Sequence, residues 1–132
     1  MLKKHLKGCG MKMNDSAFCN LVDGILTIVG VPFKHGVIEF SDRAPPVFIG
    51  YNFYDVPKCH GDGNETATEY FITFDIISEY TAEIDRVYSR LLELLTENDF
   101  CRAGGSYSAH SDYPKYYQKS VDFEYCMECE NT

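Results

Sequence analysis

The strongest constraint on the fold is a change of hydrophobic period close to residue 79. Apolar and polar residues alternate over residues 68–77, which predicts a β-strand with one buried face. Apolar residues then recur every three or four positions over residues 80–98, which predicts an amphipathic helix. The side chains expected in the core are Tyr70, Ile72, Phe74, Ile76, Ile84, Val87, Tyr88, Leu91, Leu94 and Leu95. A strand that leads almost directly into a helix, each with one apolar face, predicts a layer of helix packed on a layer of sheet.

A second amphipathic helix is predicted near the start of the chain. It is expected to follow an N-cap at Asn14, Asp15 or Ser16 and to end at Gly30, because Pro32 forbids its continuation. Its apolar face consists of Phe18, Leu21, Val22, Ile25, Ile28 and Val29.

The rest of the chain supplies strands and connections. Strands are predicted over residues 37–40, 47–54 and 117–127. Glycine, proline and polar residues are frequent in residues 55–67 and 100–114, so we expect exposed connections there, the first as a long hairpin loop. The predicted fold class is α+β, with a mostly antiparallel sheet of about four to five strands and two helices packed on one face.

The charge of the chain is unevenly distributed. Four lysines and no acidic residue give residues 1–13 a charge of +4, so residues 14–132 must carry −12 to reach the formal net charge of −8. We expect residues 14–132 to form a single α+β domain. Residues 1–13 are predicted to be a basic extension that is disordered or an artefact of the assigned start, with Met11 or Met13 as the true start. The acidic domain argues against specific nucleic-acid binding, which needs clustered Lys and Arg.

No signal peptide or membrane span is expected. Gly8, Cys9 and Gly10 interrupt the apolar run that a signal peptide needs after its basic start. The longest uncharged runs, residues 24–33 and 44–54, fall short of the roughly 18 residues that span a bilayer. We therefore expect no membrane association, and six reduced cysteines rather than a disulfide framework.

One set of residues suggests a metal or redox site. Cys126 and Cys129 form a single Cys-x-x-Cys, and Cys59 with His60 would complete a four-ligand zinc set if the long hairpin folded back on the C-terminal strand. A small metal-binding or redox module is therefore the alternative function. Unligated thiols are the simpler interpretation, and we predict no metal and no cofactor.

A second set contains the residue types of a hydrolase. Ser108, His110 and Asp112 lie two positions apart in one predicted loop. That spacing does not line up a nucleophile, a base and an orienting carboxylate. We predict no catalytic residue.

Several segments of the chain are informative about function through their order and spacing. They are the helix end at residues 28–32, the aromatic strand at residues 46–55, the strand at residues 70–78 leading into the helix that ends at Leu95, Phe100 after that helix, and the tyrosine-rich strand ending at residues 121–125. In this order and spacing, about residues 16–127 resemble the tail-completion, or tail-terminator-like, proteins of tailed bacteriophages and of prophages in Gram-positive bacteria. The sequence departs from that family at Asp99, where the family often has glycine before the closing phenylalanine.

The resemblance implies a structural, non-enzymatic role. Such proteins form rings, often hexamers, that finish the tail tube and join it to the head, so the expected partners are further copies of the chain, tail-tube proteins and head-connector proteins. The expected location is the host cytoplasm during assembly and then the virion tail. Long exposed loops suit contacts between ring neighbours. The interface candidates in the two predicted connections are Asp55, Lys58, Asp62, Asn64, Glu65, Tyr107 and Tyr113.

Overall fold

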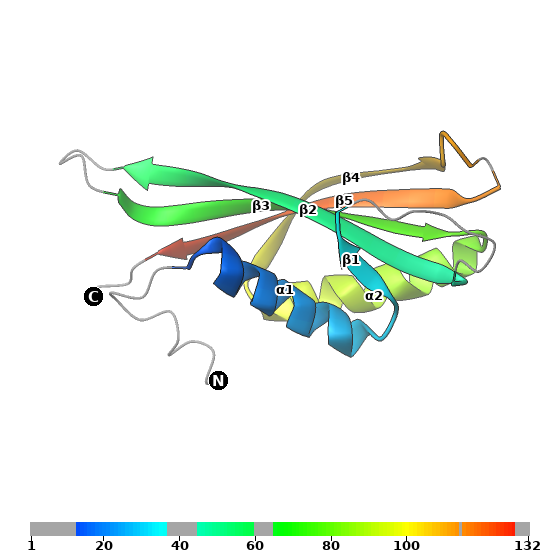
Figure 1. Cartoon of the computed structure of the whole chain (residues 1–132), viewed down its shortest axis with the longest axis horizontal. Helices are drawn as coiled ribbons and strands as arrows, with labels where there is room; N and C mark the ends of the chain where they lie inside the picture. The colour runs from blue at the N-terminus through cyan, green and yellow to red at the C-terminus, as the bar shows by residue number, and fades with distance from the viewer. Residues whose placement is uncertain (1–12, 37–44, 60–64, 114, 129–132) are drawn as a thin grey trace.

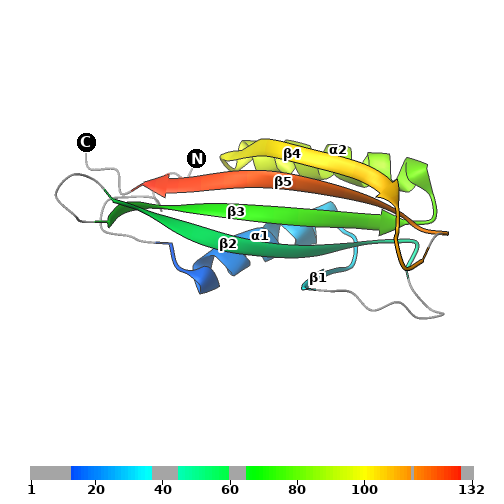
Figure 2. The same ribbon diagram turned by 90° about the horizontal axis from the view of Figure 1, so that it is seen from above.

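Two helices cover one face of a five-stranded sheet in the computed structural model, which describes residues 13–36, 45–59, 65–113 and 115–128 (Figure 1). The elements are α1 (Asp15–Val29), β1 (Phe33–His35), β2 (Val47–Cys59), β3 (Glu65–Ser78), α2 (Thr81–Glu97), β4 (Phe100–Ala109) and β5 (Tyr117–Glu128). The strand order is β1-β2-β3-β5-β4, and every pair is antiparallel except β1 with β2 (Figure 2). The predicted α+β class is confirmed.

Helix α1 has the ends that the sequence predicts. The Asn14 side chain accepts a hydrogen bond of 2.8 Å from the Ala17 N–H, which satisfies one of the free donors of the first turn. Gly30 ends the helix at φ 87°, and its N–H donates to the Leu26 carbonyl at 3.1 Å. Only glycine adopts this left-handed conformation at little cost, so the position suits its residue.

The link from β3 to α2 and on to β4 depends on three polar residues. The buried Ser78 hydroxyl donates to the Pro46 carbonyl at 2.6 Å and accepts from the Tyr80 N–H at 2.9 Å. At the other end of α2, the Asn98 side chain donates to the Leu94 carbonyl at 2.8 Å. Asp99 then turns the chain at φ 73°, a left-handed conformation that favours glycine but that Asp tolerates better than most residues.

The core lies between the helices and the sheet. Every side chain that the change of period places in the core is buried or packs against it, with Tyr88 partly exposed. Phe18 of α1 stacks on Tyr70 of β3 with ring centroids 4.2 Å apart, so both helices bury their apolar faces on the same side of the sheet. Met13, ahead of α1, also packs against this core, and its carbonyl accepts from the Tyr70 hydroxyl at 3.1 Å.

The prediction of a long loop at residues 55–67 is wrong, because β2 continues to Cys59 and β3 begins at Glu65. The misleading residue is Pro57, which pairs with Thr68 inside the sheet. The Ile49 N–H donates to the Pro32 carbonyl, and the Tyr51 carbonyl accepts from the Gly36 N–H, so both groups face β1. Odd-numbered residues of β2 therefore point their backbone N–H and C=O groups away from β3. Pro57 therefore places its missing N–H on the outer edge and costs β3 no hydrogen bond.

The prediction of a connection over residues 100–114 is also wrong for most of its length, because Phe100–Ala109 forms β4. This strand is the outermost of the sheet, and past Phe100 its side chains are exposed except for the half-buried Gly104. An edge strand with so little burial needs no alternation of apolar residues, so its pattern is that of a loop. The strand predicted at residues 37–40 lies outside the described residues, and the parallel strand β1 precedes it.

Candidate functional site

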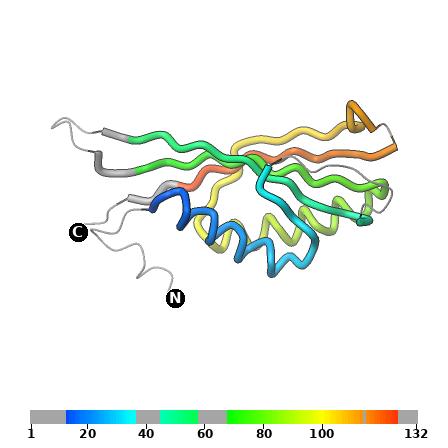
Figure 3. Tube along the Cα trace, viewed as in Figure 1, coloured from blue at the N-terminus to red at the C-terminus, as the bar shows by residue number. Residues whose placement is uncertain are grey.

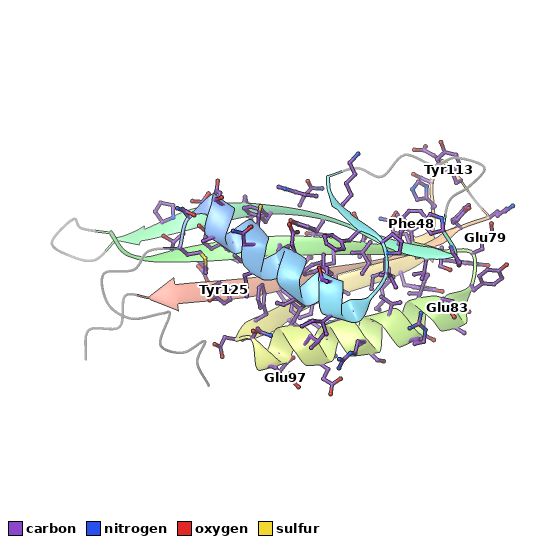
Figure 4. All side chains as sticks on the ribbon, turned by 60° about the horizontal axis from the view of Figure 1, so that its bottom comes forward. Phe48, Glu79, Glu83, Glu97, Tyr113 and Tyr125 are labelled. Atoms are coloured by element: carbon purple, nitrogen blue, oxygen red, sulfur yellow. The ribbon has the colours of Figure 1, made fainter. Side chains whose placement is uncertain are left out.

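Exposed tyrosines gather at one end of the sheet, where β4 ends, β5 begins and α2 starts. We call this cluster the tyrosine end; it consists of the exposed Tyr80, Tyr107, Tyr113 and Tyr117 and the half-buried Tyr116. The Tyr107 and Tyr117 rings are parallel, with centroids 6.1 Å apart. The Tyr116 ring lies 6.4 Å from that of Phe48, and Figure 4 shows Phe48, Glu79 and Tyr113 at this end of the sheet. Exposed tyrosines are typical of protein interfaces because a rigid apolar ring carries a polar tip.

A shallow pocket opens among the residues of this end. It has a volume of about 230 Å³ and is lined by Pro45, Pro46, Glu79, Tyr80 and Tyr116. Burial raises the pKa of the Tyr116 phenol, and the Glu79 carboxylate raises it further. Glu79 also forms an exposed ion pair of 3.4 Å with Lys115. The pocket thus offers a neutral phenol and one acidic side chain between proline rings.

The outer edge of β4 has backbone groups without a strand beside them among the described residues. The His110 N–H donates to the Tyr116 carbonyl at 2.8 Å, in the register that pairs Ala109 with Tyr117. Because backbone groups alternate along a strand, the N–H and C=O groups of residues 106 and 108 then point toward β5. Those of Gly105, Tyr107 and Ala109 point outward. Residues 103–109 include no proline and no charged residue, and the register shift of β4 lies before Gly104, so the edge from Gly104 to Ala109 is open to pairing with another strand.

The opposite edge of the sheet is only partly covered. Strand β1 pairs with residues 49–51 of β2, and the outward backbone groups of Phe53 and Asp55 lie beyond it. Figure 3 shows β2 and β3 continuing past the start of α1. Under this extension lies an open hollow of about 610 Å³ whose lining includes Asp15, Asp55 and Tyr70. The sheet therefore has two different accessible edges on its opposite sides.

The face of the sheet that carries no helix is acidic. By strand alternation, its described side chains in β2, β3, β4 and β5 include four carboxylates and no Lys or Arg: Glu69, Asp75, Asp122 and Glu124. Thr73 donates to Asp122 at 2.7 Å and Ser120 donates to Asp75 at 2.6 Å, so these hydroxyls hold two of the carboxylates in place. Lys34 of β1 lies at the margin of this face.

The predicted interface residues fall at opposite ends of the sheet. Tyr107 and Tyr113 belong to the tyrosine end, and Asp55 lies on β2 toward the β2–β3 hairpin. Lys58 and Glu65 occupy strand positions of that hairpin rather than a loop. Asp62 and Asn64 lie outside the described residues. Tyr107, Tyr113, Tyr116 and Tyr117 are close in the sequence, which groups them as an interface, whereas Tyr80 at the start of α2 joins them only through strand order.

Two of the candidate metal ligands, Cys59 and Cys126, lie toward the hairpin end of the sheet. The register sets Cys126 level with Val56, three residues before Cys59, with β3 between the two strands. His60 and Cys129 lie outside the described residues. Within the part of the chain that the structure describes, no three His, Cys, Asp or Glu side chains are placed to hold one metal ion.

The residues of the hydrolase hypothesis shape a turn. The Nδ1 atom of His110 accepts from the backbone N–H groups of Asp112 and Tyr113, at 3.1 and 3.3 Å. Its lone pair is therefore engaged with the backbone, as in a structural turn. This arrangement leaves Nδ1 of His110 unsuited to take a proton from Ser108.

Comparison with protein-family models gives no match, and comparison with curated proteins gives no significant match. In the described ranges, neither helix has the length and apolar character needed to cross a membrane.

Proposed function

We propose that this chain is a self-assembling structural subunit of a tailed phage or prophage, which ends the tail tube and joins it to the head. The order and spacing of its segments, which resemble those of tail-terminator-like proteins, support the phage role. The observation that carries self-assembly is the outer edge of β4, which is regular, uncharged and lined by small side chains from Gly104 to Ala109 apart from Tyr107. In a chain with a net charge of −8, an uncharged edge is where two copies approach with least repulsion.

The second copy contributes the outer edge of β2 beyond β1. Strand β4 runs antiparallel to β2, because each runs opposite to its neighbour along the order β2-β3-β5-β4. A neighbour in the same orientation would therefore set its β2 antiparallel to β4. Since β1 already pairs with residues 49–51, the contact must be staggered toward Phe53 and Asp55. Stagger of this kind is what a sheet needs to close on itself, and joining two different edges generates a ring.

In such a ring the acidic face of the sheet borders the lumen. Carboxylates at Glu69, Asp75, Asp122 and Glu124 repel DNA phosphates, so DNA passes without binding. The helices then lie on the outside. This orientation agrees with the expected absence of specific nucleic-acid binding.

Replacing Ala109 with proline tests the proposed contact. Proline removes an outward N–H without removing a hydrogen bond to β5, so Ala109→Pro should fold but lose self-association and fail to finish tails. Association is measured by sedimentation velocity at the concentration at which the wild-type chain assembles, and function by the length and head attachment of tails in complementation.

The matched control is Ala109→Val, which keeps the N–H and suits a strand. It should assemble like the wild-type chain. Normal rings and normal tails from a folded Ala109→Pro chain would refute a contact through the β4 edge.

A further inference from the structure

A cysteine and a histidine meet between α1 and β1, the short strand that covers part of the β2 edge. The Sγ atom of Cys19 lies 3.8 Å from Nδ1 of His35. Cys19 is half-buried in the second turn of α1, and His35 is an exposed residue of β1. Sulfur and nitrogen at this distance form the long hydrogen bond typical of a thiol and an imidazole.

The imidazole of His35 is held in place by two aromatic rings. It stacks on Tyr51 with centroids 4.7 Å apart and an angle of 3°, and on Phe53 with centroids 5.2 Å apart. The parallel register of β1 with β2 sets His35 beside Tyr51, which fixes the backbone under the ring. The nitrogen that faces Cys19 is therefore positioned by the fold. A base oriented by a third group is the arrangement that activates a nucleophile.

The other side of the thiol is occupied by a neutral phenol and a carboxylate. The Tyr51 hydroxyl donates to Oδ1 of Asp23 at 2.8 Å, one helical turn beyond Cys19. Burial raises the pKa of Tyr51, and Asp23 and Cys19 raise it further. Tyr51 thus remains a hydrogen-bond donor, and the groups facing Cys19 are His35, Tyr51 and Asp23.

We propose that Cys19 is a modification site, at which His35 acts as the base and a low-molecular-weight disulfide is the substrate. Nδ1 of His35 takes the thiol proton, and the Cys19 sulfur attacks one sulfur of the disulfide. The new S–S bond joins Cys19 to half of the reagent, and the old S–S bond breaks. The departing thiolate takes up a proton, so Cys19 is oxidised and the departing sulfur is reduced. The nucleophile is the Cys–His pair rather than the thiol alone.

Cys101 serves as the internal reference. It is exposed on β4, whereas Cys19 is half-buried, so accessibility alone predicts that Cys101 reacts faster. Activation by His35 predicts the opposite order. Trypsin cleavage at Lys12, Lys34, Arg90 and Arg102 would place Cys19 and Cys101 each in a peptide with no other cysteine.

The experiment treats the full folded chain with oxidised glutathione and follows both peptides by mass spectrometry without reductant. We expect Cys19 to react about tenfold faster than Cys101, which is less than the roughly 10²–10⁴-fold contribution of a positioned base because Cys19 is half-buried. His35→Phe preserves an aromatic ring against Tyr51 but removes the base, and should slow Cys19 about tenfold while leaving Cys101 unchanged. In urea the two cysteines should react at similar rates.

Thermal unfolding of each variant shows that it is folded, and His35→Gln provides a second test if the Phe variant is not. Faster reaction at Cys101 than at Cys19 in the folded wild-type chain would overturn the proposal. An unchanged Cys19 rate in a folded His35 variant would overturn it as well. Neither result bears on ring assembly, which depends on β4 and β2.

Discussion

At the scale of single residues, Tyr51 shows how a polar group is kept in the core. Its side chain is 1% exposed, yet its hydroxyl reaches the half-buried Asp23 at the margin of α1. Burial raises the pKa of Tyr51 above its ordinary value of 10.0, and the Asp23 carboxylate adds to this effect. The phenol is therefore held in its neutral form, and the hydrogen bond to Asp23 ties β2 to α1.

We predict that Tyr51→Phe lowers the free energy of unfolding by about 1–2 kcal/mol near neutral pH, because Asp23 loses an O–H donor. Above about pH 10 the unfolded chain releases the Tyr51 proton while the folded chain retains it, so the wild-type protein loses this stabilisation as the pH rises. The gap between wild type and variant should narrow from that pH upward. Urea unfolding at pH 8 and pH 10.5 measures it, and a gap that stays constant would contradict the prediction.

At the scale of elements, hydrophobic periodicity predicted the helices and strands that bury one face in the core. Both helices and β3 bury one face each, so their apolar spacing is visible in the sequence. The predicted bounds of the helices agree with the structure within about two residues, whereas β3 begins three residues before its predicted start. Strand β4 was missed because it buries little beyond Phe100. Pro57 was interpreted as part of a loop. A strand tolerates proline where the missing N–H faces no neighbouring strand, and which side of β2 has a neighbour at Pro57 depends on strand order.

The face of α2 supplies the prediction for this scale. Leu91 is 0% exposed and belongs to the same core cluster as Tyr70, Ile72 and Phe74. We expect Leu91→Ala to lower the free energy of unfolding by about 2–5 kcal/mol through lost burial and a residual cavity. Ser89→Ala, on the exposed face of the same helix, should change it by less than about 0.5 kcal/mol. Equal effects of the two substitutions in chemical denaturation would show that α2 does not pack through this stripe.

At the scale of the molecule, the sheet brings together residues that no local pattern links. The tyrosine end draws on α2, β4 and β5, and the Cys19–His35 pair draws on α1 and β1. Tyr107, Tyr113, Tyr116 and Tyr117 could be grouped from the sequence because they are close along the chain. The addition of Tyr80 depends on the long-range pairing of β3 with β5. The candidate site was therefore predictable only in part.

The proposed ring contact joins two different edges, so two variants that each lack one edge should complement each other. Asp55→Pro would remove an outward N–H of the free β2 edge without removing a hydrogen bond to β3, as Pro57 does two positions on. The Asp55→Pro chain keeps its β4 edge, whereas Ala109→Pro keeps its β2 edge and lacks a competent β4 edge. Neither variant should associate alone. An equimolar mixture should form a heterodimer and no larger species, because one complementary pair of edges remains.

Native mass spectrometry of the two variants, alone and mixed, distinguishes the possible contacts. A heterodimer that appears only in the mixture requires a heterologous contact, which is the kind that closes a ring. Dimers of the Asp55→Pro chain by itself would instead mean that two β4 edges pair with each other. That contact is isologous and stops at two copies, so the ring geometry proposed here would be wrong even though β4 would still be the interface.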